Sequence, residues 1–247
     1  MMLNRCRAAA ILACALAAGC GSSSAPSAVS NPSQCRTYQT QFTRRVIYTG
    51  FTSPDETSTC VLDSAGSTLS CSGPFTLAAG CGGSLTTTYR YGSLSDFIAE
   101  ARAVGSVLET QEQETLNRPS SCGVSGTGIV NFTYDSSKRL QVRDASSPSS
   151  AMTLRVAYNG WDSVLRPTSG IETGNSVPSP CSATLSYDDQ SRTFRNAVVC
   201  TAPASTGEER ITYDANGNIV AIQESMNGAV VSAETRSIDR TDTVCNK

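Results

Sequence analysis

At residues 211–220 the chain reads Ile-Thr-Tyr-Asp-Ala-Asn-Gly-Asn-Ile-Val. Ile211 and Tyr213 lie two positions apart with the polar Thr212 between them, and this period of two predicts a β-strand with one buried face. Asp214 begins a tight turn, because its carboxylate accepts hydrogen bonds from backbone N–H groups, and Gly217 supplies a position with φ > 0. The stretch therefore predicts a β-hairpin whose tyrosine lies in the core.

The same shape recurs along the chain. Alternating apolar residues, a Tyr-Asp pair and a polar turn follow one another at 130–142 and 185–194, and weaker copies lie at 156–165 and 61–69. The residues between the apolar positions are mostly polar or small, which is typical of an antiparallel sheet with one buried and one wetted face. We therefore expect an all-β fold, an antiparallel meander of repeated hairpins that forms one large twisted or partly closed sheet, stapled by disulfides.

These Tyr-Asp turns resemble the YD repeats of bacterial RHS-type proteins, whose motif reads roughly Tyr-Asp-x-x-Gly-Arg-Leu and builds successive β-hairpins. The glycine stands in place next to a full Tyr-Asp at Asp214 to Gly217. Arg139 and Arg192 match the family's arginine, whereas Asn218 does not. The resemblance is scattered over several windows and implies hairpin architecture, with no activity attached to it.

A longer repeat is also present. Thr43 to Ser53 and Thr153 to Ser163 share Thr, Arg, Val, Tyr, Gly and Ser in register. We infer a tandem duplication of about 43–122 and 153–245, within a single β-meander domain at 35–247.

Two further segments, 96–117 and 219–238, are both expected to form hairpins. The second contains Asn227-Gly228, a strong hairpin signal. The first has some helical character around Phe97 to Arg102.

The N-terminus carries an export signal. Arg5 and Arg7 precede an unbroken apolar run at 8–18, which is too short to span a bilayer but has the length of a signal-peptide core. The run ends Leu16-Ala17-Ala18-Gly19-Cys20, which resembles the lipobox of bacterial lipoproteins.

In that family a diacylglycerol is attached to the cysteine, the signal is cleaved before it, and the new amine is acylated, commonly with palmitate. The resemblance implies a signal peptide at 1–19, cleavage between Gly19 and Cys20, and lipid on Cys20. The alternative is an ordinary secretory signal with Cys20 as an incidental thiol.

Residues 20–34 are rich in Ser, Pro and Gly and predict a flexible tether. Gly21 is not the Asp that often retains lipoproteins at an inner membrane. The expected location is therefore the cell envelope, lipid-anchored at the outer membrane on its periplasmic or surface face.

The cysteines predict disulfides. Of the 11 cysteines, Cys6 and Cys14 leave with the signal and Cys20 is taken by lipid. An even set remains, which in an exported chain predicts disulfide bonds: Cys35, Cys60, Cys71, Cys81, Cys122, Cys181, Cys200 and Cys245. Two pairs, Cys181–Cys200 and Cys60–Cys71, each flank one predicted turn and are expected to bridge their own hairpins. The pairing of the other four stays open.

Composition argues against several kinds of site. The chain has no histidine and no Cys-x-x-Cys pair, so neither zinc nor haem, nor any other metal or cofactor, is expected. The net charge of −2 is scattered, whereas nucleic-acid binding needs a concentrated basic face.

Catalysis is not expected either. Without histidine there is no Ser-His-Asp or Cys-His arrangement. Paired carboxylates remain as candidates for glycoside hydrolysis, and the acids available are Glu109, Glu112, Glu114, Asp188, Asp189, Glu208 and Glu209. We expect these acids to be solvated, as adjacent acids in loops ordinarily are. Asp135, Asp188 and Asp214 match no calcium-binding loop, and turn capping accounts for them.

Two classes of function remain. The first is a membrane-anchored, non-catalytic structural or interaction module that presents a β-sheet to an envelope protein or a glycan. The second is a carrier of a small apolar ligand in a barrel-like cavity. Bulky inward residues, which would fill a small barrel, favour the first: Phe132, Tyr134, Tyr158, Tyr187 and Tyr213. Trp161, the single tryptophan, is the candidate exposed aromatic contact unless it packs over the sheet edge.

Overall fold

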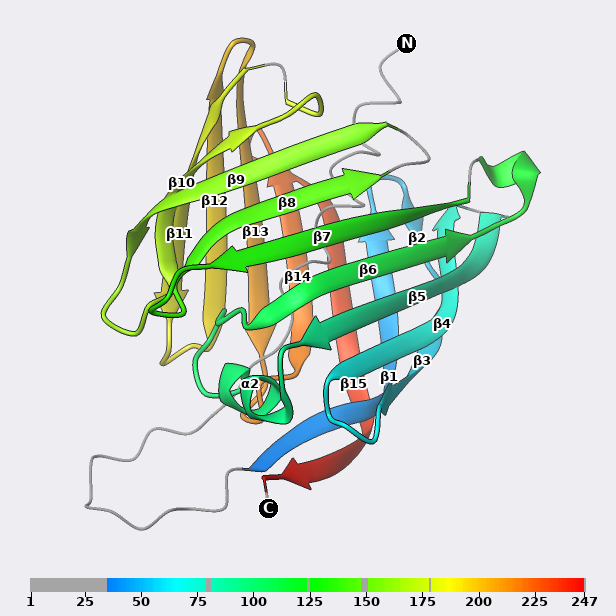
Figure 1. Ribbon diagram of the computed structural model, residues 1–247. Coiled ribbons are helices and arrows are strands. Elements are labelled where there is room, and N and C mark those ends of the chain that lie inside the picture. The colour runs from blue at the N-terminus through cyan, green and yellow to red at the C-terminus, as the bar shows by residue number, and fades with distance from the viewer. Residues whose placement is uncertain (1–34, 79–80, 124, 148–150, 178, 247) are drawn as a thin grey trace.

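The computed structural model describes residues 35–78, 81–123, 125–147, 151–177 and 179–246 (Figure 1). The signal peptide, lipobox and tether expected at 1–34 lie outside these residues. The strands in chain order are β1 (Cys35–Tyr48), β2 (Phe51–Thr52), β3 (Glu56–Leu62), β4 (Thr68–Ala78), β5 (Cys81–Tyr91), β6 (Glu109–Asn117), β7 (Gly126–Tyr134), β8 (Leu140–Ser147), β9 (Met152–Trp161), β10 (Pro167–Thr173), β11 (Cys181–Asp188), β12 (Thr193–Thr201), β13 (Ala204–Tyr213), β14 (Ile219–Met226) and β15 (Ala229–Cys245). A helix, α2 (Leu94–Glu100), and a 3-10 turn, η1 (Ser120–Cys122), complete the described elements.

The strands form a closed antiparallel barrel. Neighbours in sequence are neighbours in the sheet from β3 to β15, β3 pairs with β1, and the short β2 pairs only with β1. The last strand returns to the first: β15 pairs with β1 from Cys245 opposite Cys35 to Ser232 opposite Tyr48. The meander expected from the sequence is therefore confirmed, and its closure leaves no long free edge for another chain to extend.

The two faces of the wall differ as the period of two predicts. In β9 Leu154, Val156 and Tyr158 are buried inside the barrel, whereas Thr153 and Arg155 are exposed outside it. The outer face carries ion pairs such as Arg155–Asp144 at 3.0 Å. It also carries cross-strand pairs of hydroxyl groups: Thr37–Thr243 at 2.9 Å, Thr43–Thr57 at 3.0 Å and Ser70–Thr88 at 3.2 Å. The interior holds the apolar core.

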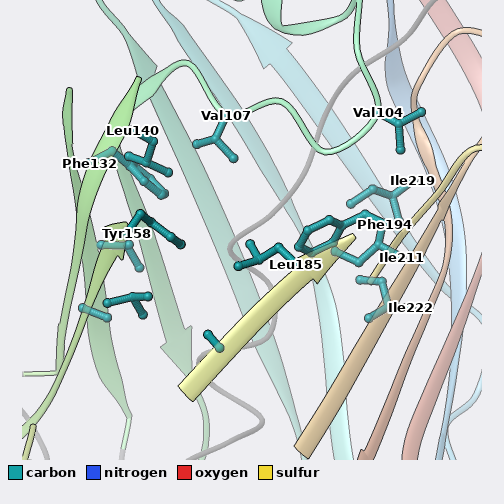
Figure 2. Close-up of a cluster of buried hydrophobic side chains, with 14 of the residues drawn as sticks. Val104, Val107, Phe132, Leu140, Tyr158, Leu185, Phe194, Ile211, Ile219 and Ile222 are labelled. Carbon is teal, nitrogen blue, oxygen red and sulfur yellow. The ribbon is translucent and has the colours of Figure 1, made fainter. Parts of the chain in front are cut away.

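Two opposite walls share that core. In Figure 1, β6 to β9 cross the front obliquely, and β12 to β15 run more upright behind them. Figure 2 shows Phe132 and Tyr158 on one side of the cluster and Phe194 and Ile211 on the other, with Val107 at its end. A second apolar cluster, built on Tyr38, Phe42, Leu69, Tyr89 and Phe97, lies between β1, β3 to β5 and α2.

The two ends of the barrel are built differently. The end where β1 begins and β15 stops, here called the turn end, holds α2 and the tight turns that begin at Asp63, Asp135, Asp162, Asp188 and Asp214. At the opposite end, here called the loop end, β6, β8 and β10 stop and β7, β9 and β11 begin.

The expected hairpin at 96–117 is wrong. Residues 94–100 form α2, whose N-cap Ser93 accepts a hydrogen bond from the N–H of Asp96 at 3.1 Å, and residues 109–117 form the single strand β6. Phe97 and Ile98 are buried, so the helix persists because it packs against the barrel interior. The hairpin expected at 219–238 is present, as β14, a turn at Asn227-Gly228, and β15.

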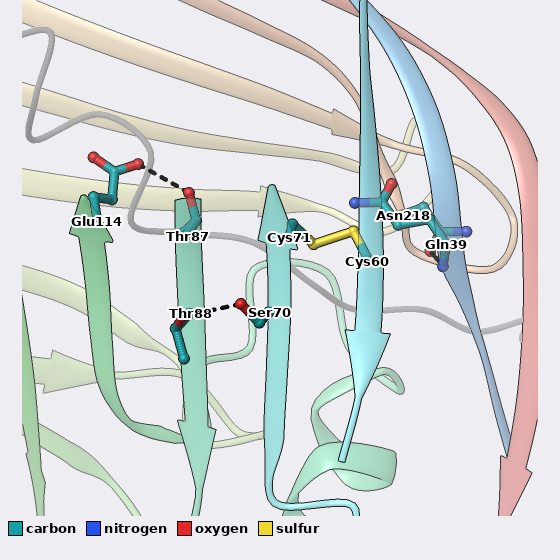
Figure 3. Close-up of a disulfide and its surroundings, with 8 residues drawn as sticks. All are labelled: Gln39, Cys60, Ser70, Cys71, Thr87, Thr88, Glu114 and Asn218. Carbon is teal, nitrogen blue, oxygen red and sulfur yellow. Dashed lines mark hydrogen bonds between the residues drawn. A yellow bond between two sulfur atoms is a disulfide. The ribbon is translucent and has the colours of Figure 1, made fainter. Parts of the chain in front are cut away.

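The disulfides tie neighbouring strands together. Cys60–Cys71 joins β3 to β4, Cys181–Cys200 joins β11 to β12, and both are the pairs expected from the hairpins. The structure also assigns the other four cysteines: Cys35–Cys245 locks the strands that close the barrel, and Cys81–Cys122 links the start of β5 to η1. Figure 3 shows Cys60–Cys71 beside the hydroxyl pair Ser70–Thr88.

Candidate functional site

A buried polar contact holds α2 at the turn end. Glu100 of α2 accepts hydrogen bonds from the hydroxyl of Tyr91 at 2.8 Å and the N–H of Leu108 at 2.9 Å, and it lies 3.4 Å from the guanidinium of Arg36. Arg36 also lies over the ring of Phe97, 4.1 Å from its centroid. Burial raises the pKa of Glu100, and Arg36 opposes that rise. These contacts anchor α2 against β1 and β5.

The middle of the barrel holds a charge cluster, here called the Arg143 cluster: Arg143 with Glu112, Glu172 and Glu209. The four residues come from β8, β6, β10 and β13 and all point inward. Burial raises the pKa of each carboxyl, that of Glu112 well above its usual range and that of Glu209 to about 8, while Arg143 lowers all three. Three buried carboxyls thus share the influence of one guanidinium.

Two carboxyl oxygens of this cluster accept no hydrogen bond from the described residues. Oε1 of Glu112 and Oε1 of Glu209 are buried and have no hydrogen-bond partner among the described residues. Glu112 is only 1% exposed. A buried acceptor that stays unpaired costs about 1–3 kcal/mol, so these two oxygens oppose folding and are held in place by the rest of the barrel.

A small pocket adjoins this cluster on the inner face of four neighbouring strands, β6 to β9. Eight of its lining residues form two rows across the sheet. Glu112, Val130, Ala145 and Leu154 pair in the first row, and in the second row Glu114 pairs with Gly128 and Ser147 pairs with Met152. The second row lies nearer the loop end. Gly128 from β7 and Ala145 and Ser147 from β8 line the pocket with small side chains, and the cavity volume is about 20 Å³.

The cavity volumes bear on the carrier alternative. A second pocket, between β1, β4 and β5, has a volume of about 30 Å³. Pockets that enclose small ligands measure about 300–1,000 Å³, so each of these two holds little more than one or two water-sized groups. The described pockets do not favour a carrier of an apolar ligand.

The expectation that the acidic residues are solvated is wrong for three of them. Glu109, Glu112 and Glu209 lie on strands and point into the barrel, and burial raises the pKa of all three. Glu208, the neighbour of Glu209, points outward and pairs with Arg195 at 2.7 Å. Glu114 lines the pocket, whereas Asp188 ends β11 and Asp189 lies in the turn that follows, where it pairs with Arg166 at 2.8 Å.

The turn aspartates cap their turns, as expected. In each case one carboxylate oxygen accepts hydrogen bonds from N–H groups further along the turn, such as those of Ser137 and Arg139 for Asp135. Asp214 holds Asn216 and Asn218 in the same way.

Trp161 packs against the wall, the second of the two readings from the sequence. Its indole N–H donates to the carbonyl oxygen of Leu140 at 3.0 Å, and Arg139 lies 5.0 Å from the ring. The tyrosines of the repeat lie in or against the core, with Tyr158 and Tyr213 buried.

Sequence reasoning missed Arg143, Glu112 and Glu172 as a group. A signal was present: Glu112, Glu114 and Leu116 share one face of β6 by the period of two. For Arg143 the period of two is interrupted within its own strand, because Thr133 pairs with Val142 and Tyr134 pairs with Leu140, so that the register skips Gln141. Cys20 and Gly19 lie outside the described residues.

Among the residues described, no helix is long and apolar enough to cross a bilayer. No group of three or more His, Cys, Asp or Glu is arranged there to hold a metal ion.

No protein-family model and no curated protein matches the sequence. Among solved structures, a porin-like protein from Bacteroides uniformis ATCC 8492 is similar, with 9% identity and a TM-score of 0.35 over 81% of this chain and 96% of that one. A likeness at this level says nothing of function, and the barrel rests on the strand pairing of this chain alone.

Proposed function

We propose that this chain is an extracytoplasmic lipoprotein, tethered to the membrane by lipid on Cys20, whose barrel acts as a non-catalytic interaction module. The observation that carries the proposal is the polarity of the wall. Its outer face bears hydroxyl pairs and ion pairs, and its inner face holds the core. A barrel that crosses a membrane turns an apolar band toward lipid. The outer face described here carries such polar pairs, which suit a barrel that lies in water, and the lipobox-like ending at Gly19-Cys20 supports attachment of that barrel through lipid.

The disulfides support an oxidising compartment, because such bonds persist outside the cytoplasm. The proposal places the barrel at the outer membrane, with an envelope protein or a glycan as its partner and no role with nucleic acid. It includes kinship with YD-repeat proteins, supported by the repeated aspartate turns. A non-catalytic role is supported by the small volume of the pocket beside the buried carboxyls, about 20 Å³, which has no room for a sugar ring.

The test is the intact mass of the protein purified from its native membrane, with and without reduction before alkylation. We expect a chain that starts at Cys20 and carries a diacylglycerol and an N-acyl group. The cysteines of the four disulfides should react with the alkylating reagent only after reduction. Cys20→Ala should abolish labelling with radioactive palmitate, whereas Cys14→Ala, in the apolar run of the signal, should leave it unchanged.

An unlipidated mature chain would overturn the tether, and thiols free before reduction would contradict the disulfides. Saturable binding of a fluorescent fatty-acid probe by the delipidated protein would favour the carrier instead.

A further inference from the structure

One of the five aspartate turns at the turn end has an apolar tip. In the other four, the three residues that follow the aspartate are small or polar: Ser-Ala-Gly after Asp63, Ser-Ser-Lys after Asp135, Asp-Gln-Ser after Asp188 and Ala-Asn-Gly after Asp214. In the turn between β9 and β10, Ser-Val-Leu follows Asp162. Val164 and Leu165 are 56% and 44% exposed. Residues 162–166, here called the apolar tip, therefore place two aliphatic side chains in contact with solvent.

The exposed leucine also occupies a backbone conformation that disfavours it. Leu165 has φ of 71°, and the corresponding position in two of the other turns is a glycine, Gly66 or Gly217. A bulky residue with positive φ is uncommon, and strain of this kind at an exposed position supports a hypothesis of function. Leu165 opposes folding through its backbone and gains little packing within the barrel, which suggests a contact outside it.

The charges beside the apolar tip are paired. The carboxylate of Asp162 caps its own turn, accepting hydrogen bonds from the N–H groups of Val164 at 3.0 Å and Arg166 at 2.9 Å. The buried guanidinium of Arg166 pairs with Asp162 and with Asp189 of the next turn, both at 2.8 Å. These contacts offset the negative charge of two carboxylates next to the aliphatic side chains. The tip therefore suits a partner that is apolar and carries little net charge.

An aromatic residue and two cations lie behind the apolar tip. Trp161 ends β9, its indole N–H donates to the carbonyl oxygen of Leu140, and the guanidinium of Arg139 lies 5.0 Å from its ring. Lys138, in the neighbouring turn, is exposed. Tryptophan, lysine and arginine are typical of the boundary between a membrane and water. Aliphatic residues in front of such a group have the composition of an interfacial membrane contact.

The chain leaves the barrel toward Cys20 from this same end. In Figure 1, β1 begins beside the end of β15, at the end of the barrel that holds α2, and the Cys35–Cys245 disulfide fixes that start. Only 14 residues separate Cys20 from Cys35, which span at most about 50 Å when fully extended. A lipid on Cys20 thus attaches the turn end to the bilayer, and the loop end lies a strand length farther away.

We propose that the apolar tip docks the barrel on a phospholipid bilayer, with Val164 and Leu165 entering the boundary between the headgroups and the acyl chains. This inference rests on the proposed tether, because two aliphatic side chains bind a bilayer too weakly to hold the protein there alone. The lipid supplies the attachment and the tip sets the orientation. The wall of the barrel then stays in water, and the loop end points away from the membrane toward a partner.

The experiment uses the fluorescence of Trp161, the single tryptophan, which precedes the apolar tip. The full mature protein, purified from its native membrane, is reconstituted into phosphatidylcholine vesicles whose acyl chains carry bromine, a short-range quencher of tryptophan. Flotation of the vesicles measures the tether separately. Because an interfacial contact enters about 5–10 Å into the headgroup and acyl boundary, we expect the emission to fall about twofold relative to vesicles without bromine.

The test variant is Val164→Ser/Leu165→Asn. It removes the aliphatic surface, and asparagine tolerates the positive φ at position 165. The variant should float with the vesicles as the wild type does and should lose the quenching. Val230→Ser is the matched control, because Val230 is similarly exposed, at 52%, and lies near the start of β15 at the loop end. This control should be quenched like the wild type. Thermal melts establish that both variants are folded.

The outcomes separate the docking from the tether. A wild type that floats without quenching, or equal quenching in the wild type and Val164→Ser/Leu165→Asn, overturns the docking and leaves the tether in place. A chain that does not float overturns the tether and the docking with it. A photo-crosslinker at position 164 that reaches an envelope protein in intact membranes, and not lipid, assigns the tip to a protein partner and also overturns the proposal.

Discussion

The repeated turns show how one residue organises a hairpin. At the fourth position of the turn, counting the aspartate as the first, the N–H donates to the aspartate's carbonyl: Gly66 to Asp63 and Gly217 to Asp214, both at 3.0 Å, and Leu165 to Asp162 at 3.1 Å. That position has φ of 69° at Gly66 and 76° at Gly217, and 71° at Leu165. A side chain there strains the backbone by roughly 1–2 kcal/mol, so the turn at Leu165 is held by its aspartate and by the strands on either side.

Leu165→Gly should therefore stabilise the protein by about 1 kcal/mol. The side chain is 44% exposed, so its removal sacrifices little packing. Gly217→Ala should lower the free energy of unfolding by a similar amount, because it places a side chain at a position with positive φ. Urea unfolding of both variants measures the change, with Val164→Gly as the control, since Val164 is exposed and its φ is not positive. Equal stability of Leu165→Gly and Val164→Gly would contradict the assignment of strain.

The disulfides act on elements that are close in space but very different in sequence separation. Cys60 and Cys71 are 11 residues apart, within one hairpin, whereas Cys35 and Cys245 are 210 residues apart and join the first and last strands of the barrel. A cross-link restricts the unfolded chain more strongly when its loop is longer. The closing disulfide should therefore contribute more to stability than the hairpin disulfide.

The tandem duplication of about 43–122 and 153–245 stays a prediction.

The double variant Cys35→Ala/Cys245→Ala should lose about 5 kcal/mol of unfolding free energy, against about 3 kcal/mol for Cys60→Ala/Cys71→Ala. Equilibrium unfolding in urea under oxidising conditions compares the two variants. A larger loss for the hairpin pair would show that the packing of the buried Cys60 outweighs loop entropy.

The whole barrel responds to pH through its interior. The pKa values of Glu109, Glu112, Glu172 and Glu209 are raised by burial, that of Glu209 to about 8. Their protonated forms stabilise the fold; this contribution is complete below the pKa of the unfolded chain, about 4.5, and is lost as pH rises through the folded values. The turn carboxyls act oppositely: hydrogen bonds lower the pKa values of Asp135 and Asp188, so their contribution is lost as pH falls below about 4. We expect maximum stability near pH 5.

Glu209→Gln should flatten the decline in stability between pH 5 and pH 8 by roughly 2 kcal/mol. Its neighbour Glu208 provides the matched control. Glu208 points outward, and its ion pairs with Arg195 and Arg210 lower its pKa, so Glu208→Gln should leave that decline in place. Urea unfolding at several pH values measures both slopes, and a wild-type stability that does not fall between pH 5 and pH 8 would contradict the interior charge assignment.

Local patterns were enough for much of this architecture. The period of two at residues such as Ile211 and Tyr213, and the turn begun by Asp214, depend on a few consecutive residues, so the strands, the hairpins and the Cys181–Cys200 and Cys60–Cys71 pairs were all predictable. Closure of the barrel was not predictable, because β1 and β15 are far apart in the sequence and no local pattern marks them as partners. The helix α2 also depends on its surroundings, since Phe97 and Ile98 gain their burial from strands far away in sequence.

The interior carboxyls show the same limit most clearly. Whether Glu112 or Glu209 faces water or the core depends on strand register, and register shifts such as the one between Arg90 and Tyr91 reverse the direction of side chains along a strand. The sequence indicates which residues alternate between the two faces of a strand. It cannot indicate that carboxyls from β6, β10 and β13 converge on one arginine of β8, because their burial and the rise in their pKa values arise only when opposite walls of the closed barrel exclude water between them.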